Sequence, residues 1–169
     1  MTLPALLCFF AAAGLAWWLY MAWPGLSQDW LPDDLKAGKL VRVEEDLAAD
    51  EPEPVIGRPD QVYRLATGLH VPVELKNRDS FAVYDTDIAE ISLRAWLLRK
   101  NGMPTAGHGY VVINNRKTGK REAQSVELEN DAFCEQLIHR YIDLVTGRAK
   151  ARMAHQGKCK SCGHRSRCH

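Results

Sequence analysis

The chain has 169 residues, of which 46% are hydrophobic and 25% are charged. This composition predicts one ordinary folded domain with an appendage, and it excludes a wholly disordered chain. The formal net charge is only +1, so overall charge by itself indicates no partner. The charge is unevenly placed, because no acidic residue follows Asp143 whereas seven basic ones do: Arg148, Lys150, Arg152, Lys158, Lys160, Arg165 and Arg167. This basic end suits contact with phosphates, although a solvated tail explains it equally well.

The first 25 residues are strongly apolar. Residues 3–23 carry no charged side chain, and the stretch from Ala5 to Trp23 is about as long as the ~20 residues that cross a bilayer as a helix. Four aromatic residues gather in its second half, as they do at membrane interfaces: Trp17, Trp18, Tyr20 and Trp23. A cleaved signal peptide is the alternative, but the segment lacks the basic start and the small-residue cleavage site of such peptides. We therefore predict a transmembrane helix over residues 1–25 that contacts the membrane through residues 3–23.

The charges beyond this segment predict its orientation. No Lys or Arg precedes the apolar stretch, whereas Lys36, Lys39 and Arg42 follow it. The positive-inside rule then places the soluble part in the cytoplasm, where free thiols stay reduced. The sequence thus predicts a single-pass membrane protein whose cytoplasmic domain follows a linker over residues 26–38.

The remaining elements come in the order strands, helix, strands, helix. Residue patterns predict strands over 39–43, 55–65, 69–76, 110–113 and 122–128, with a hairpin turn at 66–68 and an acidic loop at 44–54. Helical periodicity predicts a buried helix over 87–100, where Asp87 and Glu90 have the spacing of a capping box, and a last helix over 131–145 behind Asn130. This order favours an α/β or α+β fold with a central mixed sheet flanked by helices.

Two charged motifs lie on neighbouring predicted strands. The first, Gly57-Arg58-Pro59-Asp60, ends in a carboxylate, and the second is Val73-Glu74-Leu75-Lys76. Residues two apart on a strand share a face, so Glu74 and Lys76 point the same way and Leu75 points into the core on the other face. Pairing across the turn at Gly68 would bring Asp60 near Glu74.

Converging carboxylates repel each other unless a cation lies between them, and Mg²⁺ typically binds through one or two carboxylates. Such an ion can activate a water and stabilise charge on a phosphodiester, while a neighbouring lysine orients the water or neutralises the developing charge. The alternative for an isolated motif of this kind is a surface strand with an ordinary ion pair.

Together these motifs resemble the signature of the PD-(D/E)XK nuclease superfamily, and they are closest to its RecB-like group, which includes the CRISPR-associated exonucleases. The resemblance covers about residues 39–168 and implies a restriction-endonuclease-like α/β core over residues 39–169. It also implies that Asp60, Glu74 and the Leu75 backbone carbonyl bind Mg²⁺ or Mn²⁺, and that Lys76 serves catalysis.

The family's Q-x-x-x-Y motif, which contacts DNA, falls here on Glu90 and Arg94, so both positions depart from the pattern. Arg94 remains a candidate contact to a nucleic-acid phosphate. Glu90 is expected to act as a helix cap.

The end of the chain, residues 147–169, holds a cysteine cluster in which Cys159, Cys162 and Cys168 are spaced C-x2-C-x5-C. Thiolates this close in a reducing compartment indicate metal ligands rather than disulfides, but three fall one short of a complete set. The spacing resembles the C-terminal triplet of the RecB-like exonucleases, which implies a four-iron, four-sulfur cluster. The family's fourth cysteine precedes the nuclease core and has no counterpart here. An iron–sulfur site, a zinc site and a vestigial cluster remain open, with these candidates for the fourth ligand: Cys134, His155, His164 and His169.

These features predict a membrane-anchored, metal-dependent nuclease, favoured as an exonuclease, that hydrolyses phosphodiester bonds of single-stranded DNA or duplex ends. One alternative is a non-catalytic nucleic-acid-binding module on a degenerate nuclease fold, because the Q-x-x-x-Y residues are missing. Another is a metal-sensing or redox-sensing membrane protein in which only the cysteines matter.

Overall fold

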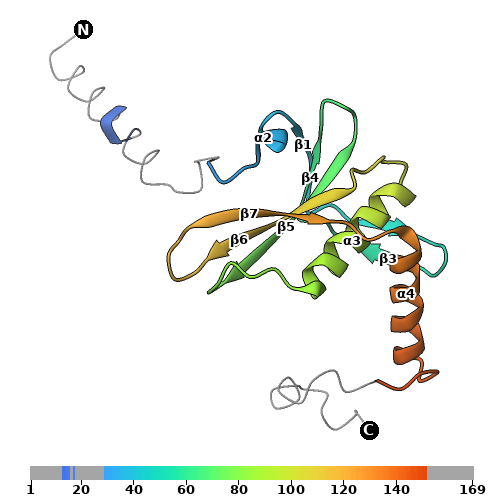
Figure 1. Ribbon diagram of the computed structural model, residues 1–169. Helices are drawn as coiled ribbons and strands as arrows, with labels where there is room; N and C mark the ends of the chain where they lie inside the picture. The colour runs from blue at the N-terminus through green and yellow to red at the C-terminus, as the bar shows by residue number, and fades with distance from the viewer. Residues whose placement is uncertain (1–12, 16, 18–28, 152–169) are drawn as a thin grey trace, which may run out of the picture.

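The computed structural model describes residues 13–15, 17 and 29–151 (Figure 1). These residues form a mixed α/β fold around a five-stranded sheet of order β1-β4-β5-β6-β7. The strands of this sheet are β1 (Lys39–Val43), β4 (Gln61–Arg64), β5 (His70–Arg78), β6 (His108–Asn115) and β7 (Arg121–Glu127). Strands β5 and β6 run parallel, and the other neighbouring pairs are antiparallel. A small second sheet pairs β2 (Leu47–Ala49) with β3 (Val55–Gly57) inside the segment that we expected to be partly loop.

Helix α3 (Asp85–Lys100) connects the two parallel strands and packs against β5 and β6 (Figure 1). A parallel pair needs such a crossover, because its strands cannot be joined by a tight turn. The helix is largely buried, with Ile91, Trp96 and Leu98 having no exposed surface, since α4 (Asp131–Val145) and β2 also contact it. Burial on several sides fixes the position of α3 over the sheet.

The segment that we expected to be a linker is packed on the other face of the sheet. The short helix α2 (Asp33–Lys36) lies there, and Leu31 and Leu35 join a core cluster with Tyr63, Val71 and Val73. Residues 31–35 are therefore part of the packed domain.

A polar contact supports the docking of α2. Tyr110 donates a hydrogen bond of 3.0 Å from its hydroxyl to Asp34, and the Nε2 atom of His108 lies 3.2 Å from the same carboxylate. Burial, together with Asp34, raises the pKa of Tyr110 to about 12.

The predicted hairpin is confirmed. Strands β4 and β5 pair antiparallel with Gln61 opposite Val73, and the turn closes through a 2.8 Å hydrogen bond from the Leu65 N–H to the Leu69 carbonyl. Gly68 in this turn has a φ of 86°, a left-handed conformation that glycine adopts readily. The last helix also matches its prediction, because Asn130 accepts a 2.9 Å hydrogen bond from the Phe133 N–H.

The start of α3 differs from its prediction. The N-cap is Tyr84, and Asp87 is the third helical residue, where its carboxylate accepts the Tyr84 N–H at 2.9 Å. Asp87 also accepts hydrogen bonds from Arg78, the last residue of β5. The predicted capping box of Asp87 with Glu90 is therefore wrong, because the box forms three residues earlier.

The predicted fold class and the predicted localisation require correction. Within residues 13–15, 17 and 29–151 there is no helix that is both apolar enough and long enough to traverse a lipid bilayer. A mixed α/β fold joined to a transmembrane helix, and a single-pass membrane protein, are therefore not supported. Most of the predicted segment, residues 1–12, 16 and 18–25, lies outside the described residues.

Candidate functional site

Five charged side chains from three elements meet on the face of the sheet that α3 covers. Asp60 directly precedes β4, Glu74 and Lys76 lie on β5, and Glu90 and Arg94 lie one turn apart on α3. The predicted Asp60, Glu74 and Lys76 are thus brought together on one side of the sheet, and the helix adds two further members. We refer to these five residues as the charged cluster.

Arg94 is the centre of this cluster. Its guanidinium forms an ion pair with Glu74 through Nη1, and the same nitrogen lies 3.4 Å from Oδ1 of Asp60. Its other terminal nitrogen, Nη2, donates to Oε1 of Glu90 at 2.8 Å. The two carboxylates that we expected to share a metal ion therefore share a guanidinium here.

Asp60 is held by the strand beside it. Its Oδ2 accepts a hydrogen bond of 2.7 Å from the Leu75 N–H, at the point where the pairing of β4 with β5 has ended. In an extended strand the N–H and C=O of one residue face the same neighbour, so the Leu75 carbonyl also faces the side of Asp60. The side chain of Leu75, expected in the core, is instead 40% exposed on the opposite face.

Lys76 lies between two carboxylates. Its Nζ is 2.6 Å from Oε1 of Glu74 and 2.6 Å from Oε2 of Glu90. The assignment of Glu90 as a helix cap is therefore wrong, because its side chain fixes Lys76 and Arg94 instead. The sequence did contain the information: Glu90 and Arg94 are four residues apart and thus share a helix face.

Two members of the cluster, Glu74 and Arg94, are largely shielded from solvent, so their charges need partners within the protein. Glu74 is only 2% exposed, and its Oε2 faces Nη1 of Arg94, so this ion pair compensates the buried charge. Burial lowers the pKa of Arg94, while Asp60 acts in the opposite direction. Three carboxylates against two cations leave the cluster with a formal charge of −1.

The donor set of this cluster fits a hard divalent cation. Asp60 and the buried Glu74 turn their carboxylates toward one cationic centre, where Oδ1 of Asp60 and Oε2 of Glu74 both face Nη1 of Arg94. Two carboxylates with a backbone carbonyl beside them are the oxygen ligands that Mg²⁺ prefers. In the arrangement described, however, no group of three or more His, Cys, Asp or Glu side chains within residues 29–151 is spaced to hold a metal ion.

The cysteine predictions fall largely outside the described part of the chain. Cys159, Cys162 and Cys168 lie outside it, as do His155, His164 and His169, so an iron–sulfur or zinc site stays a prediction. Cys134 is fully buried in the core under α4, where burial raises the pKa of its thiol to about 11. A thiol in that environment is a poor source of the thiolate that a metal needs.

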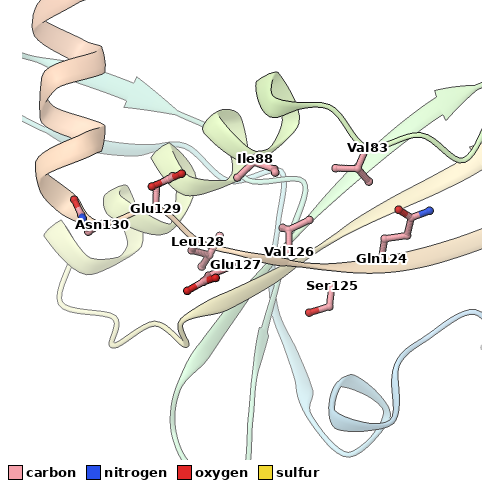
Figure 2. A pocket seen from close by; sticks show the side chains of 9 residues that line it. All are labelled: Val83, Ile88, Gln124, Ser125, Val126, Glu127, Leu128, Glu129 and Asn130. Atoms are coloured by element: carbon pink, nitrogen blue, oxygen red, sulfur yellow. The ribbon is translucent and has the colours of Figure 1, made fainter.

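A hollow of about 780 Å³ lies elsewhere, between the start of α3 and β7 (Figure 2). Figure 2 shows Val126 and Leu128 pointing toward Ile88, whereas Ser125 and Glu127 point away from it. None of its nine lining residues is basic and none belongs to the charged cluster, so this hollow does not suit a phosphate.

Comparisons with known proteins give the fold and no more. No family model matches the chain, and neither does any curated protein. Among the solved structures that do match is the crystal structure of SSO0001, which is 16% identical over 99% of this chain and 71% of that chain, with a TM-score of 0.51. Likeness at that identity indicates a shared fold alone.

Proposed function

We propose that this protein is a metal-dependent nuclease that hydrolyses phosphodiester bonds of DNA, with Asp60, Glu74 and Lys76 as its catalytic residues. One observation carries the proposal. The hairpin of β4 and β5 brings the carboxylates of Asp60 and Glu74 and the amine of Lys76 to a single place. Glu74 is only 2% exposed there. The order of these residues along the chain also resembles the PD-(D/E)XK signature.

Each residue has a role that follows from its surroundings. Asp60 and Glu74, with the Leu75 carbonyl, would hold Mg²⁺ or Mn²⁺. Such an ion would lower the pKa of a bound water and would place positive charge beside the phosphate. Lys76 is fixed at 2.6 Å from both Glu74 and Glu90, so it is oriented to position a water or to neutralise charge that develops on the phosphate.

The test is a cleavage assay with the full chain, labelled single-stranded and duplex DNA, and Mn²⁺ or Mg²⁺. Lys76→Ala and Asp60→Asn should each lower the rate by about 10² or more, as loss of a catalytic group does. Lys117→Ala is the matched control, because Lys117 is 70% exposed on a loop and should retain full activity. Metal-dependent cleavage that persists in both Lys76→Ala and Asp60→Asn would come from a contaminant and would refute the proposal.

A second candidate is a non-catalytic DNA-binding module on the same fold. The observation that favours it is the ion pairing of Arg94 with Asp60 and Glu74, which balances much of the carboxylate charge without any metal. This candidate predicts DNA binding that weakens steeply with salt and no hydrolysis with any divalent ion.

A further inference from the structure

Arg94 differs from its partners in how firmly it is held. Asp60 is fixed by the Leu75 N–H, and Glu74 is part of a strand paired in the sheet with a side chain only 3% exposed. Arg94 reaches the two carboxylates through a long side chain with several rotatable bonds, and that side chain is 16% exposed. Of the three groups, Arg94 is the one that can move without disturbing the sheet.

A destination for that movement exists on the same helix. Glu90 already accepts a hydrogen bond from Nη2 of Arg94 at 2.8 Å, and the Glu90 side chain is 42% exposed at the edge of the cluster. Arg94 can therefore release Asp60 and Glu74 while it keeps one carboxylate partner. A divalent ion in the vacated place would balance the two formal charges of Asp60 and Glu74, whereas the guanidinium supplies only one.

We propose that Arg94 is a built-in counter-ion that competes with the divalent cation for Asp60 and Glu74, and that the cation binds only when Arg94 withdraws toward Glu90. This inference rests on the proposed function, because it concerns the cation of the same site. It assigns Arg94 a positioning role that regulates metal occupancy.

Competition of this kind weakens metal binding by a calculable factor. The apparent dissociation constant equals the intrinsic one divided by the fraction of molecules whose site is open. The charge-assisted, partly buried contact of Arg94 with Asp60 and Glu74 is strong enough that the two carboxylates are free of Arg94 in roughly one molecule in 10 to one in 100. Removal of Arg94 should therefore tighten metal binding by about 10- to 100-fold.

The experiment measures Mn²⁺ binding to the full chain by electron paramagnetic resonance, without any DNA substrate. Arg94→Ala should bind Mn²⁺ at least about tenfold more tightly than the wild type. Arg99→Ala, which removes an arginine of the same helix whose partner is Asp131, should match the wild type. Added guanidinium at millimolar, non-denaturing concentration should weaken Mn²⁺ binding in Arg94→Ala by refilling the vacated place, and it should leave the wild-type affinity unchanged.

The outcomes separate this inference from the proposed function. Equal Mn²⁺ affinity in the wild type and Arg94→Ala overturns the competition while the nuclease proposal stands. Absence of Mn²⁺ binding in both proteins overturns the metal site, and with it both proposals.

Arg94→Ala leaves Glu74 without its counter-ion and can fail to fold. The wild type then provides the test through the Arg94 Nε–H resonance in a ¹⁵N spectrum, identified by its loss in Arg94→Lys. Saturating Mg²⁺ should shift this resonance and speed its exchange with water. A resonance that stays unshifted and protected in saturating Mg²⁺ overturns the inference.

Discussion

Replacing Asp87 by alanine should destabilise the fold by about 3 kcal/mol, because it removes one partner of a buried ion pair. The Asp87 side chain is 3% exposed and binds Arg78 through both carboxylate oxygens, at 2.7 Å and 2.5 Å. It also accepts the Tyr84 N–H. Alanine leaves Arg78 without its carboxylate partner and the Tyr84 N–H without an acceptor. Breaking such a pair costs about 3–5 kcal/mol, and the lower end applies because Arg78 is 22% exposed and keeps a hydrogen bond to the Ala82 carbonyl.

The measurement is urea unfolding of the full chain followed by tryptophan fluorescence. With a slope of about 2 kcal/mol per molar urea, the midpoint should fall by about 1.5 M. Asp85→Ala is the control, because Asp85 is an exposed aspartate in the same first turn of α3 and should cost below about 1 kcal/mol. Equal midpoints for the two variants would refute the reasoning.

The same pair gives a pH dependence with a definite sign. Burial raises the pKa of Asp87, but the hydrogen bonds from Arg78 and Tyr84 outweigh it, so the pKa lies below its ordinary value. A lowered pKa stabilises the fold above the unfolded value of about 3.9, and this contribution is lost as the pH falls through the folded value. The difference in free energy of unfolding between the wild type and Asp87→Ala should therefore have its full value near pH 6 and shrink below about pH 4. A difference that stays constant down to pH 2 would contradict this.

Two further predictions concern residues packed in the core of the domain. Gly109→Ala should lower the free energy of unfolding by about 1–3 kcal/mol, because the added Cβ would lie 2.8 Å from Ile91 and 3.0 Å from the Pro72 carbonyl. Gly107→Ala is the control, because its Cβ would meet nothing within 4 Å and the change should be nearly neutral. Thermal or urea unfolding measures both variants. Equal stabilities of these two variants would argue against the tight contact of α3 with β6. Burial raises the pKa of the Cys134 thiol to about 11, so this thiol should resist iodoacetamide at pH 8 until the protein is unfolded. Mass spectrometry that finds Cys134 alkylated in the native protein would contradict its place in the core.

Local patterns predicted the hairpin and the last helix well, because their determinants are close in the sequence. Gly68 permits the turn, and Asn130 caps the helix through its own neighbour Phe133. The hairpin in turn fixes the register that brings Asp60 beside the Leu75 N–H, so the first half of the charged cluster followed from strand periodicity.

Contacts between distant segments could not be read in the same way. Leu31 and Leu35 lie in a polar stretch that resembles a linker, and only the open face of the sheet explains their burial. Glu90 has the spacing of a cap, yet the crossover geometry of α3 over β5 turns it toward Lys76, 14 residues earlier. Leu75 continues an apolar alternation, but it lies where the sheet face is no longer covered and stays exposed.

The central claim is that Asp60 and Glu74 form the binding site of one divalent cation. The most direct measurement is an anomalous-scattering map from crystals of the full chain equilibrated with Mn²⁺. A single peak between the two carboxylates, with the Arg94 guanidinium moved toward Glu90, is the predicted result. A map without a peak there at saturating Mn²⁺, with Arg94 still paired to Glu74, would contradict the account.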